Sequence, residues 1–208
     1  MENLNLVLPE IFISLAIMFL LILGVFKKDS SKLIHNFSLI ILLITGGIIF
    51  NETLTVENVL LFNVSIVIDY LASFMKFITI IAALMALIVS SNYLKTFKIL
   101  KIEYPILVIC AVLGMMVMIS SNDLIVFYIG LELQSLSLYV LSSFNRDEVK
   151  SSEAGLKYFV LSALSSGLLL YGCSLIYGFS GSTYFDIIAN KLYSDQYVLT
   201  FGIVFILV

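Results

Sequence analysis

Long apolar runs separated by short polar segments dominate the chain from its first residues to its last. A helix needs about 20 apolar residues to cross a bilayer. Six runs meet or approach that length: Leu6–Phe26, Leu33–Phe50, Ile66–Asn92, Pro105–Ser120, Asn122–Phe144 and Ser152–Phe179. A seventh run starts near Gln196 and is cut off after about thirteen residues, which is too short to cross. The pattern predicts an all-α, polytopic transmembrane bundle with six complete spans and a truncated seventh.

Two of the polar segments have patterns of their own. Residues 51–65 contain Thr-Val and Asn-Val-Ser pieces that could pair as a short hairpin, and Thr183–Tyr193 reads as a short amphipathic piece. Within the second run, Thr45-Gly46-Gly47 predicts close helix packing, because small residues let two helix backbones approach each other.

The composition agrees with a membrane protein and excludes several other classes. The chain is 61% hydrophobic and 12% charged, which is more apolar than a soluble domain needs. It has no basic patch with interleaved aromatics, so a nucleic-acid partner is not expected. Cys110 and Cys173 both lie in apolar runs and are interpreted as packing residues. A single histidine argues against haem or iron–sulfur ligation, and we expect no cofactor in this chain.

The basic residues predict how the spans are oriented. Alternate connections carry eight of them, and the opposite connections carry only Lys191. The eight are Lys27, Lys28, Lys32, Lys95, Lys98, Lys101, Arg146 and Lys150. Because basic loops stay on the side where the protein is made, these loops are expected to face the cytoplasm or matrix. The N-terminus would then lie outside, in the periplasm or its equivalent.

Glu132 is the main candidate functional residue. It lies near the midpoint of the Asn122–Phe144 run, where an acid costs about 2.5 kcal/mol or more to insert. Tyr128, Ser135 and Tyr139 occupy positions −4, +3 and +7 from it and share its helix face. Ionisable residues at such depth usually mark a proton or ion path. The alternative is a structural acid that is hydrogen-bonded to a neighbouring helix.

Two lysines within the apolar runs are further candidates for the proton path. Lys157 lies about 8 Å below the start of its run, and Glu132 about 18 Å from the same side. The difference of about 10 Å predicts a water-mediated link between them, with snorkelling of Lys157 to the headgroups as the alternative. Lys76 lies about ten residues into the third run. It would belong either to the path or to an ion pair with an acid on another helix.

Other polar residues of the spans are expected to play supporting parts. Ser162 lies on a weakly polar surface of the sixth run and could order water beside Lys157, although packing explains it equally well. Asp69 and Asp123 stand at span ends and are expected to cap helices, with a role in proton exit as the alternative. Glu10 lies close to the outer interface and is expected to be structural.

Two adjoining motifs resemble a known family. They are Gly130-Leu-Glu-Leu-Gln-Ser-Leu136 and Lys150-Ser-Ser-Glu-Ala-Gly-Leu-Lys-Tyr-Phe159, followed by Leu161-Ser-Ala and Ser166-Gly-Leu-Leu-Leu-Tyr-Gly172. At this spacing they are similar to the antiporter-like membrane subunits of proton-pumping NADH:quinone oxidoreductase (respiratory complex I). The Glu-Ala-x-x-Lys-Tyr-Phe run favours the subunit N family, called NADH dehydrogenase subunit 2 in mitochondria.

The resemblance implies a fold and a division of the chain. These subunits contain two inverted five-helix repeats, preceded by extra N-terminal helices. Residues 1–104 would be the N-terminal helices 1–3, and residues 105–208 the first repeat, with helices 4–6 and a truncated helix 7. Glu132 would be the helix-five glutamate and Lys157 the helix-six lysine of a buried, hydrated proton path. The helix-seven lysine would lie just past Val208.

The resemblance also implies a function. The chain would be a multi-pass, membrane-arm subunit that couples electron transfer from NADH to quinone to proton translocation. It would have no redox or catalytic centre of its own, since NADH, FMN, iron–sulfur clusters and quinone would be bound by partner subunits. The bacterial inner membrane, or alternatively the mitochondrial one, would be its location. Two alternatives stay open: a subunit of a cation/proton (Na⁺/H⁺) antiporter, and a non-transporting membrane scaffold.

Overall fold

The computed structural model describes residues 6–26, 31–53, 58–97, 99, 101–192 and 196–207, the side chains of 192 and 196–199 excepted. The helices in these ranges are α1 (Leu8–Phe26), α2 (Ser31–Thr53), α3 (Tyr70–Thr96), α4 (Glu103–Ile119), α5 (Leu124–Ser142), α6 (Val149–Ser180), α7 (Phe185–Leu192) and α8 (Gln196–Leu207). One antiparallel hairpin joins β1 (Val59–Leu61) to β2 (Ile66–Ile68).

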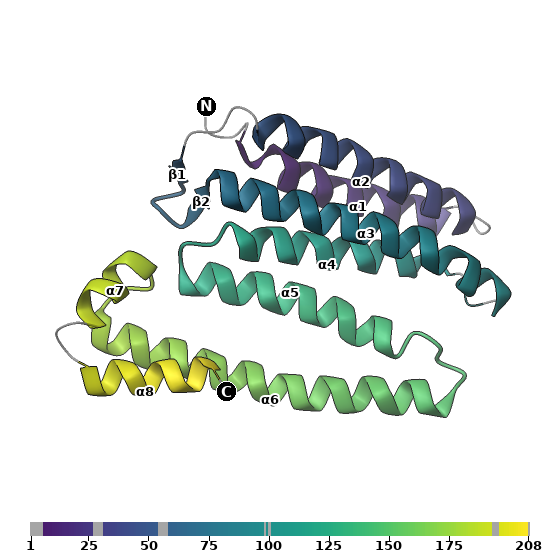
Figure 1. Cartoon of the computed structure of the whole chain (residues 1–208). Helices are drawn as coiled ribbons and strands as arrows, with labels where there is room; N and C mark the ends of the chain where they lie inside the picture. The colour runs from purple at the N-terminus through teal and green to yellow at the C-terminus, as the bar shows by residue number, and fades with distance from the viewer. Residues whose placement is uncertain are drawn as a thin grey trace.

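The long helices lie side by side and alternate in direction (Figure 1). Helices α1, α2 and α3 pack together at one side of the molecule, α4 and α5 follow, and α6 lies at the other side with α8 along half of its length. The hairpin and α7 lie at one end of the bundle, here called the hairpin end. The starts of α2, α4 and α6 lie at the opposite end, which carries the basic connections and is here called the basic end.

The predicted membrane bundle is confirmed. Five helices are long and apolar enough to cross a membrane: α1, α2, α3, α5 and α6. The remaining predicted span is α4, an apolar helix of 17 residues, and the seventh apolar run is α8, with 12 residues. Large apolar side chains such as Leu15, Phe19 and Val89 are exposed on the outer helix faces, as expected for surfaces that contact lipid.

The third run was predicted to be helical from Ile66, and this was wrong. Ile66–Ile68 instead pairs with Val59–Leu61, since β-branched residues suit a strand. The helix begins at Tyr70, where Oδ1 of Asp69 accepts a hydrogen bond from the Ala72 amide at 2.6 Å. Lys76 is therefore only about 9 Å from the start of its helix and does not lie at mid-span.

Helices α4 and α5 cross with their backbones in contact. A methyl group added at Gly114 would lie 2.6 Å from the Gln134 nitrogen and 2.7 Å from the Gly130 oxygen. Close packing was also expected at Gly46 and Gly47, but the α4–α5 contact at Gly114 is tighter. A methyl group added at Gly46 would lie 3.4 Å from its nearest atom, and one added at Gly47 would have no atom within 4 Å. The glycine crossing of α4 and α5 holds the helix that carries Glu132.

We expect Gly114→Ala to separate α4 from α5 and to lower the free energy of unfolding by about 1–3 kcal/mol, because no flexible side chain can yield to the new methyl group. Gly47→Ala is the matched control, a helical glycine with nothing within 4 Å. Thermal unfolding of the two full-length variants in detergent measures the difference. Equal transition temperatures would contradict the crossing.

Candidate functional site

Glu132 is the ninth residue of the 19-residue helix α5 and is half-buried. Its Oε1 atom is buried and has no hydrogen-bond partner among the described residues. Buried polar atoms are nearly always hydrogen-bonded, so an orphaned carboxylate oxygen needs an explanation. A carboxyl group that gains and loses a proton, or that binds transient water, supplies one.

The face of α5 that carries Glu132 packs against α6. Tyr128 interacts electrostatically with Glu132 and with Ser166 of α6. The Tyr139 hydroxyl donates a hydrogen bond to the Ser162 hydroxyl of α6. Because Tyr128 and Tyr139 share the face of Glu132, the carboxylate also lies toward α6.

These contacts bring four of the candidate residues predicted from sequence to one helix interface. Tyr128, Glu132 and Tyr139 come from α5, and Ser162 comes from α6. Ser135 is half-buried on the same face of α5. Sequence reasoning missed Ser166 as a neighbour of Tyr128, although its spacing of four from Ser162 places both serines on one face of α6.

Lys157 does not join this interface. Its side chain is 69% exposed, and its Nζ lies 2.6 Å from Oε1 of Glu153, one turn earlier on α6. Tyr139 of α5 contacts Tyr158, Phe159 and Ser162 of the antiparallel α6. Along the helix axes, Glu132 lies about 10 Å from Tyr139, and Lys157 lies about 2–8 Å from these contacts in the opposite direction. The two residues are therefore about 12–18 Å apart along the helices, and the described contacts of Lys157 do not include Glu132.

Lys76 has an acid partner on another helix. Its Nζ lies 2.5 Å from Oε1 of Glu10, which joins α3 to α1. The lysine side chain is 2% exposed and the glutamate 11%. Of the two interpretations that the sequence left open, the structure supports the interhelical ion pair. Within the described residues, Lys76 thus belongs to a cluster at the hairpin end and not to the α5–α6 interface.

Asp123 fixes the start of the Glu132 helix. Its Oδ1 accepts a hydrogen bond from the Ile125 amide at 2.7 Å, and its Oδ2 accepts one from the Thr183 hydroxyl. The Leu124 amide donates to the Thr183 carbonyl at 3.0 Å. The expected cap is confirmed, and the same carboxylate also ties α5 to the segment between α6 and α7.

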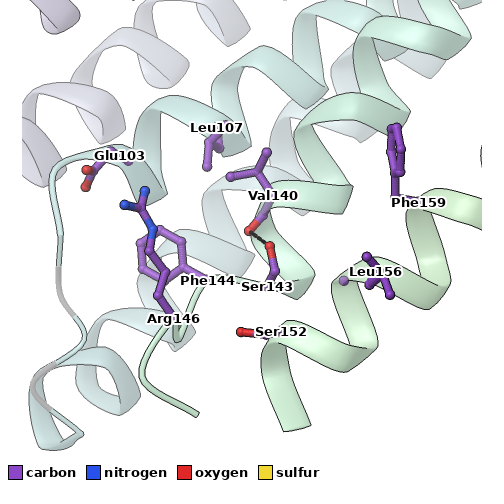
Figure 2. Close-up of a pocket in the computed structure, with 10 residues that line it drawn as sticks. Glu103, Leu107, Val140, Ser143, Phe144, Arg146, Ser152, Leu156 and Phe159 are labelled. Atoms are coloured by element: carbon purple, nitrogen blue, oxygen red, sulfur yellow. Dashed lines mark hydrogen bonds between the residues drawn. The ribbon is translucent and has the colours of Figure 1, made fainter. Parts of the chain in front are cut away.

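A cavity of about 520 Å³ opens between α4, α5 and α6 at the basic end (Figure 2). Ten residues line it: Glu103, Leu107, Val140, Ser143, Phe144, Arg146, Ser152, Gly155, Leu156 and Phe159. Figure 2 shows Arg146 reaching from the α5–α6 connection toward Glu103. The Phe159 ring packs edge-on against Tyr139, with centroids 5.7 Å apart. The lining of the cavity thus includes a residue, Phe159, that contacts one partner of the Tyr139–Ser162 hydrogen bond.

Comparison with known proteins gives the class first. Residues 121–208, which include α5, α6 and their junctions, match the family described as NADH:quinone oxidoreductase/Mrp antiporter, TM. The fold and the match make this an antiporter-like membrane subunit. Over all 208 residues the chain is 67% identical to NADH-quinone oxidoreductase subunit N of Pelagibacter ubique (strain HTCC1062). It belongs to that subunit N family, and it spans 44% of the length of the Pelagibacter protein.

Solved structures share the fold. A chain of respiratory complex I from Thermus thermophilus superposes with a TM-score of 0.80 at 21% identity, covering 96% of this chain and 42% of that one. A chain of an Mrp complex from Dietzia sp. DQ12-45-1b gives a TM-score of 0.77 at 20% identity, covering 98% and 40%. The fold is therefore common to both kinds of complex and does not distinguish them.

Proposed function

We propose that this protein is a membrane-arm subunit of NADH:quinone oxidoreductase in a bacterial inner membrane. It would couple electron transfer from NADH to quinone to the translocation of protons. The observation that carries the proposal is the half-buried Glu132, whose Oε1 has no described partner, at an interface lined with hydroxyl groups. NADH, FMN, iron–sulfur clusters and quinone would be bound by the partner subunits, and the charge movement would occur in this one.

The α5–α6 interface supports a route for the proton. Water in the cavity at the basic end would deliver it to the Tyr139–Ser162 pair. From there the proton would move past Ser166 and Tyr128 to Glu132, because hydroxyl groups both donate and accept hydrogen bonds. With the N-terminus outside, as the basic loops predict, this route begins at the cytoplasmic side.

The two lysines would act at different points. At about 12–18 Å and an effective dielectric constant of about 20, the charge of Lys157 changes the energy of Glu132 by only about 0.9–1.4 kcal/mol. We therefore propose Lys157 as a proton acceptor near the basic end and not as the charge partner of Glu132. Lys76, paired with Glu10, would act at the hairpin end.

Two alternative functions predict different partner subunits and different ion transport. An Mrp-type cation/proton antiporter has the same fold, but the 67% identity to a subunit N protein favours the oxidoreductase. A non-transporting scaffold leaves the orphaned oxygen of Glu132 unexplained.

Purification of the tagged full-length protein from its native membrane tests the assignment. We expect flavin and iron–sulfur subunits to co-purify and the preparation to reduce quinone with NADH. Co-purification with antiporter subunits alone, without NADH-dependent activity, would favour the first rival.

Lys157→Met and Glu153→Gln form a matched pair, since each breaks the same exposed ion pair from one side. Such a pair contributes about 0.3–0.5 kcal/mol, so both variants should unfold at nearly the same temperature. We expect proton pumping by the assembled complex to fall only in Lys157→Met. An equal effect of the two variants on pumping would remove Lys157 from the path.

A further inference from the structure

The cavity at the basic end changes from charged to apolar along its depth (Figure 2). Glu103 is the first residue of α4, and Arg146 lies in the α5–α6 connection, so the charged groups stand at the helix ends. Leu107 lies about 6 Å further along α4, and Phe159 lies about 15 Å from the start of α6. A charged mouth beside an apolar wall matches a membrane interface, where headgroups meet hydrocarbon.

The apolar wall of the cavity is open to lipid. Val140, Leu156 and Phe159 line the cavity and are nevertheless 46%, 66% and 49% exposed, respectively. Large apolar side chains of α5 and α6 thus contact the cavity and the bilayer at once. A small water-soluble ligand would leave this apolar surface uncovered, whereas the acyl chains of a lipid would cover it.

The two charged groups at the mouth have no ionic partner within the described ranges. The ion pairs found there are Lys76–Glu10 and Lys157–Glu153, so neither Arg146 nor Glu103 belongs to one. Both side chains are exposed, and Figure 2 shows Arg146 on the side of the mouth that faces Glu103. One cation and one anion are therefore available to a ligand at the same opening.

The charges around the mouth are balanced. The connection Asn145–Lys150 carries two cations and two anions, and the lining of the cavity includes one of each. Anionic lipids are drawn to clusters of several basic residues, which this lining does not offer. A headgroup that contains a phosphate and an ammonium group matches the lining charge for charge.

We propose that the cavity binds a phosphatidylethanolamine molecule, from the cytoplasmic leaflet on the predicted topology. The planar guanidinium of Arg146 suits a phosphate, to which it donates two parallel hydrogen bonds. The Glu103 carboxylate accepts hydrogen bonds from the primary ammonium, and the acyl chains lie along Leu156 and Phe159. A choline headgroup has the same charges but no N–H to donate, so phosphatidylcholine is the weaker ligand.

The lipid site does not depend on the proton route through Glu132. It needs only a chain that spans the membrane and a cavity whose mouth lies at the helix ends. A phospholipid headgroup carries hydration water, so the cavity keeps water for the proposed route when the lipid is bound.

Photolabelling of the intact full-length complex in phosphatidylcholine nanodiscs tests the site. The nanodiscs contain a trace of phosphatidylethanolamine with a photoreactive diazirine in one acyl chain, and mass spectrometry maps the labelled peptides. We expect labelling of the peptide that contains Leu156 and Phe159. Replacing part of the bulk lipid by unlabelled phosphatidylethanolamine should suppress this labelling, and the same amount of anionic phosphatidylglycerol should not.

Arg146→Gln and Glu103→Gln should each lower the labelling of this peptide about tenfold, because each removes a charge-assisted hydrogen bond to the headgroup. Lys150→Gln and Glu148→Gln are the matched controls, since they change exposed charges of the same signs that do not line this cavity. Both controls should keep the parental labelling. Because all four side chains are exposed, we expect each variant complex to assemble, which native gel electrophoresis checks.

Equal labelling in Arg146→Gln and Lys150→Gln would identify an unselective boundary lipid and overturn the proposal. Suppression by phosphatidylglycerol would overturn it as well, because the site would then select for negative charge. Absence of label from the peptide in the parent complex would mean that protein covers the cavity. The competition in the parent complex needs neither a variant nor pumping activity, so its outcome is separate from the fate of the proposed function.

Discussion

Glu132→Gln in the full-length protein should abolish quinone-coupled proton pumping while the complex still assembles. The glutamine amide keeps the shape of the side chain but cannot gain and lose a proton. It places a neutral group at the position of Oε1 of Glu132, which has no hydrogen-bond partner among the described residues. We expect pumping by inside-out membrane vesicles, followed with a pH-sensitive dye, to fall to the background of uncoupled vesicles. Native gel electrophoresis would report assembly.

Glu148→Gln makes the same chemical change at an exposed position and is expected to leave pumping at the parental rate. Normal pumping in an assembled Glu132→Gln complex would refute a proton path through the α5–α6 interface. Loss of assembly in this variant alone would instead identify Glu132 as a structural acid.

Lys76→Met should destabilise the protein by about 3–5 kcal/mol, because it removes one partner of a buried ion pair and leaves Glu10 without its counter-charge. The double variant Glu10→Gln/Lys76→Met should unfold closer to the parental temperature, since it leaves no unpaired charge in this pair. Thermal unfolding of the full-length variants in detergent measures both effects. A double variant as unstable as the single one would show that Lys76 contributes packing and not charge pairing.

The membrane-spanning helices could be predicted from sequence because each needs about 20 apolar residues in succession to cross the bilayer. The caps at Asp69 and Asp123 could be predicted as well, since the donor amides lie within three residues of each carboxylate. The start of α3 could not be predicted from sequence. The apolar residues Ile66–Ile68 suit a helix or a strand, and the pairing with Val59–Leu61 decides for the strand.

Contacts between distant residues were the part that the sequence could not specify. Glu10 and Lys76 are 66 positions apart, and nothing local to either one identifies the other. The ion pair of Lys157 with Glu153 could not be chosen from sequence over a link to Glu132, because the packing of α6 decides which of its faces is covered. The Gly114–Gly130 crossing could have been found from small residues in adjoining runs, but which pair of glycines meets depends on how the helices rotate.

The distance along the chain between Glu10 and Lys76 has a consequence for biogenesis. The ribosome makes Glu10 well before Lys76, since 66 positions separate them, so α1 and α2 exist before α3 can supply the counter-charge. Until then Glu10 lacks the counter-charge that Lys76 supplies in the folded chain, and an unpaired acid in apolar surroundings is costly. The ion pair can form only after the third helix has been made, so pairing of the first and third helices follows the synthesis of all three.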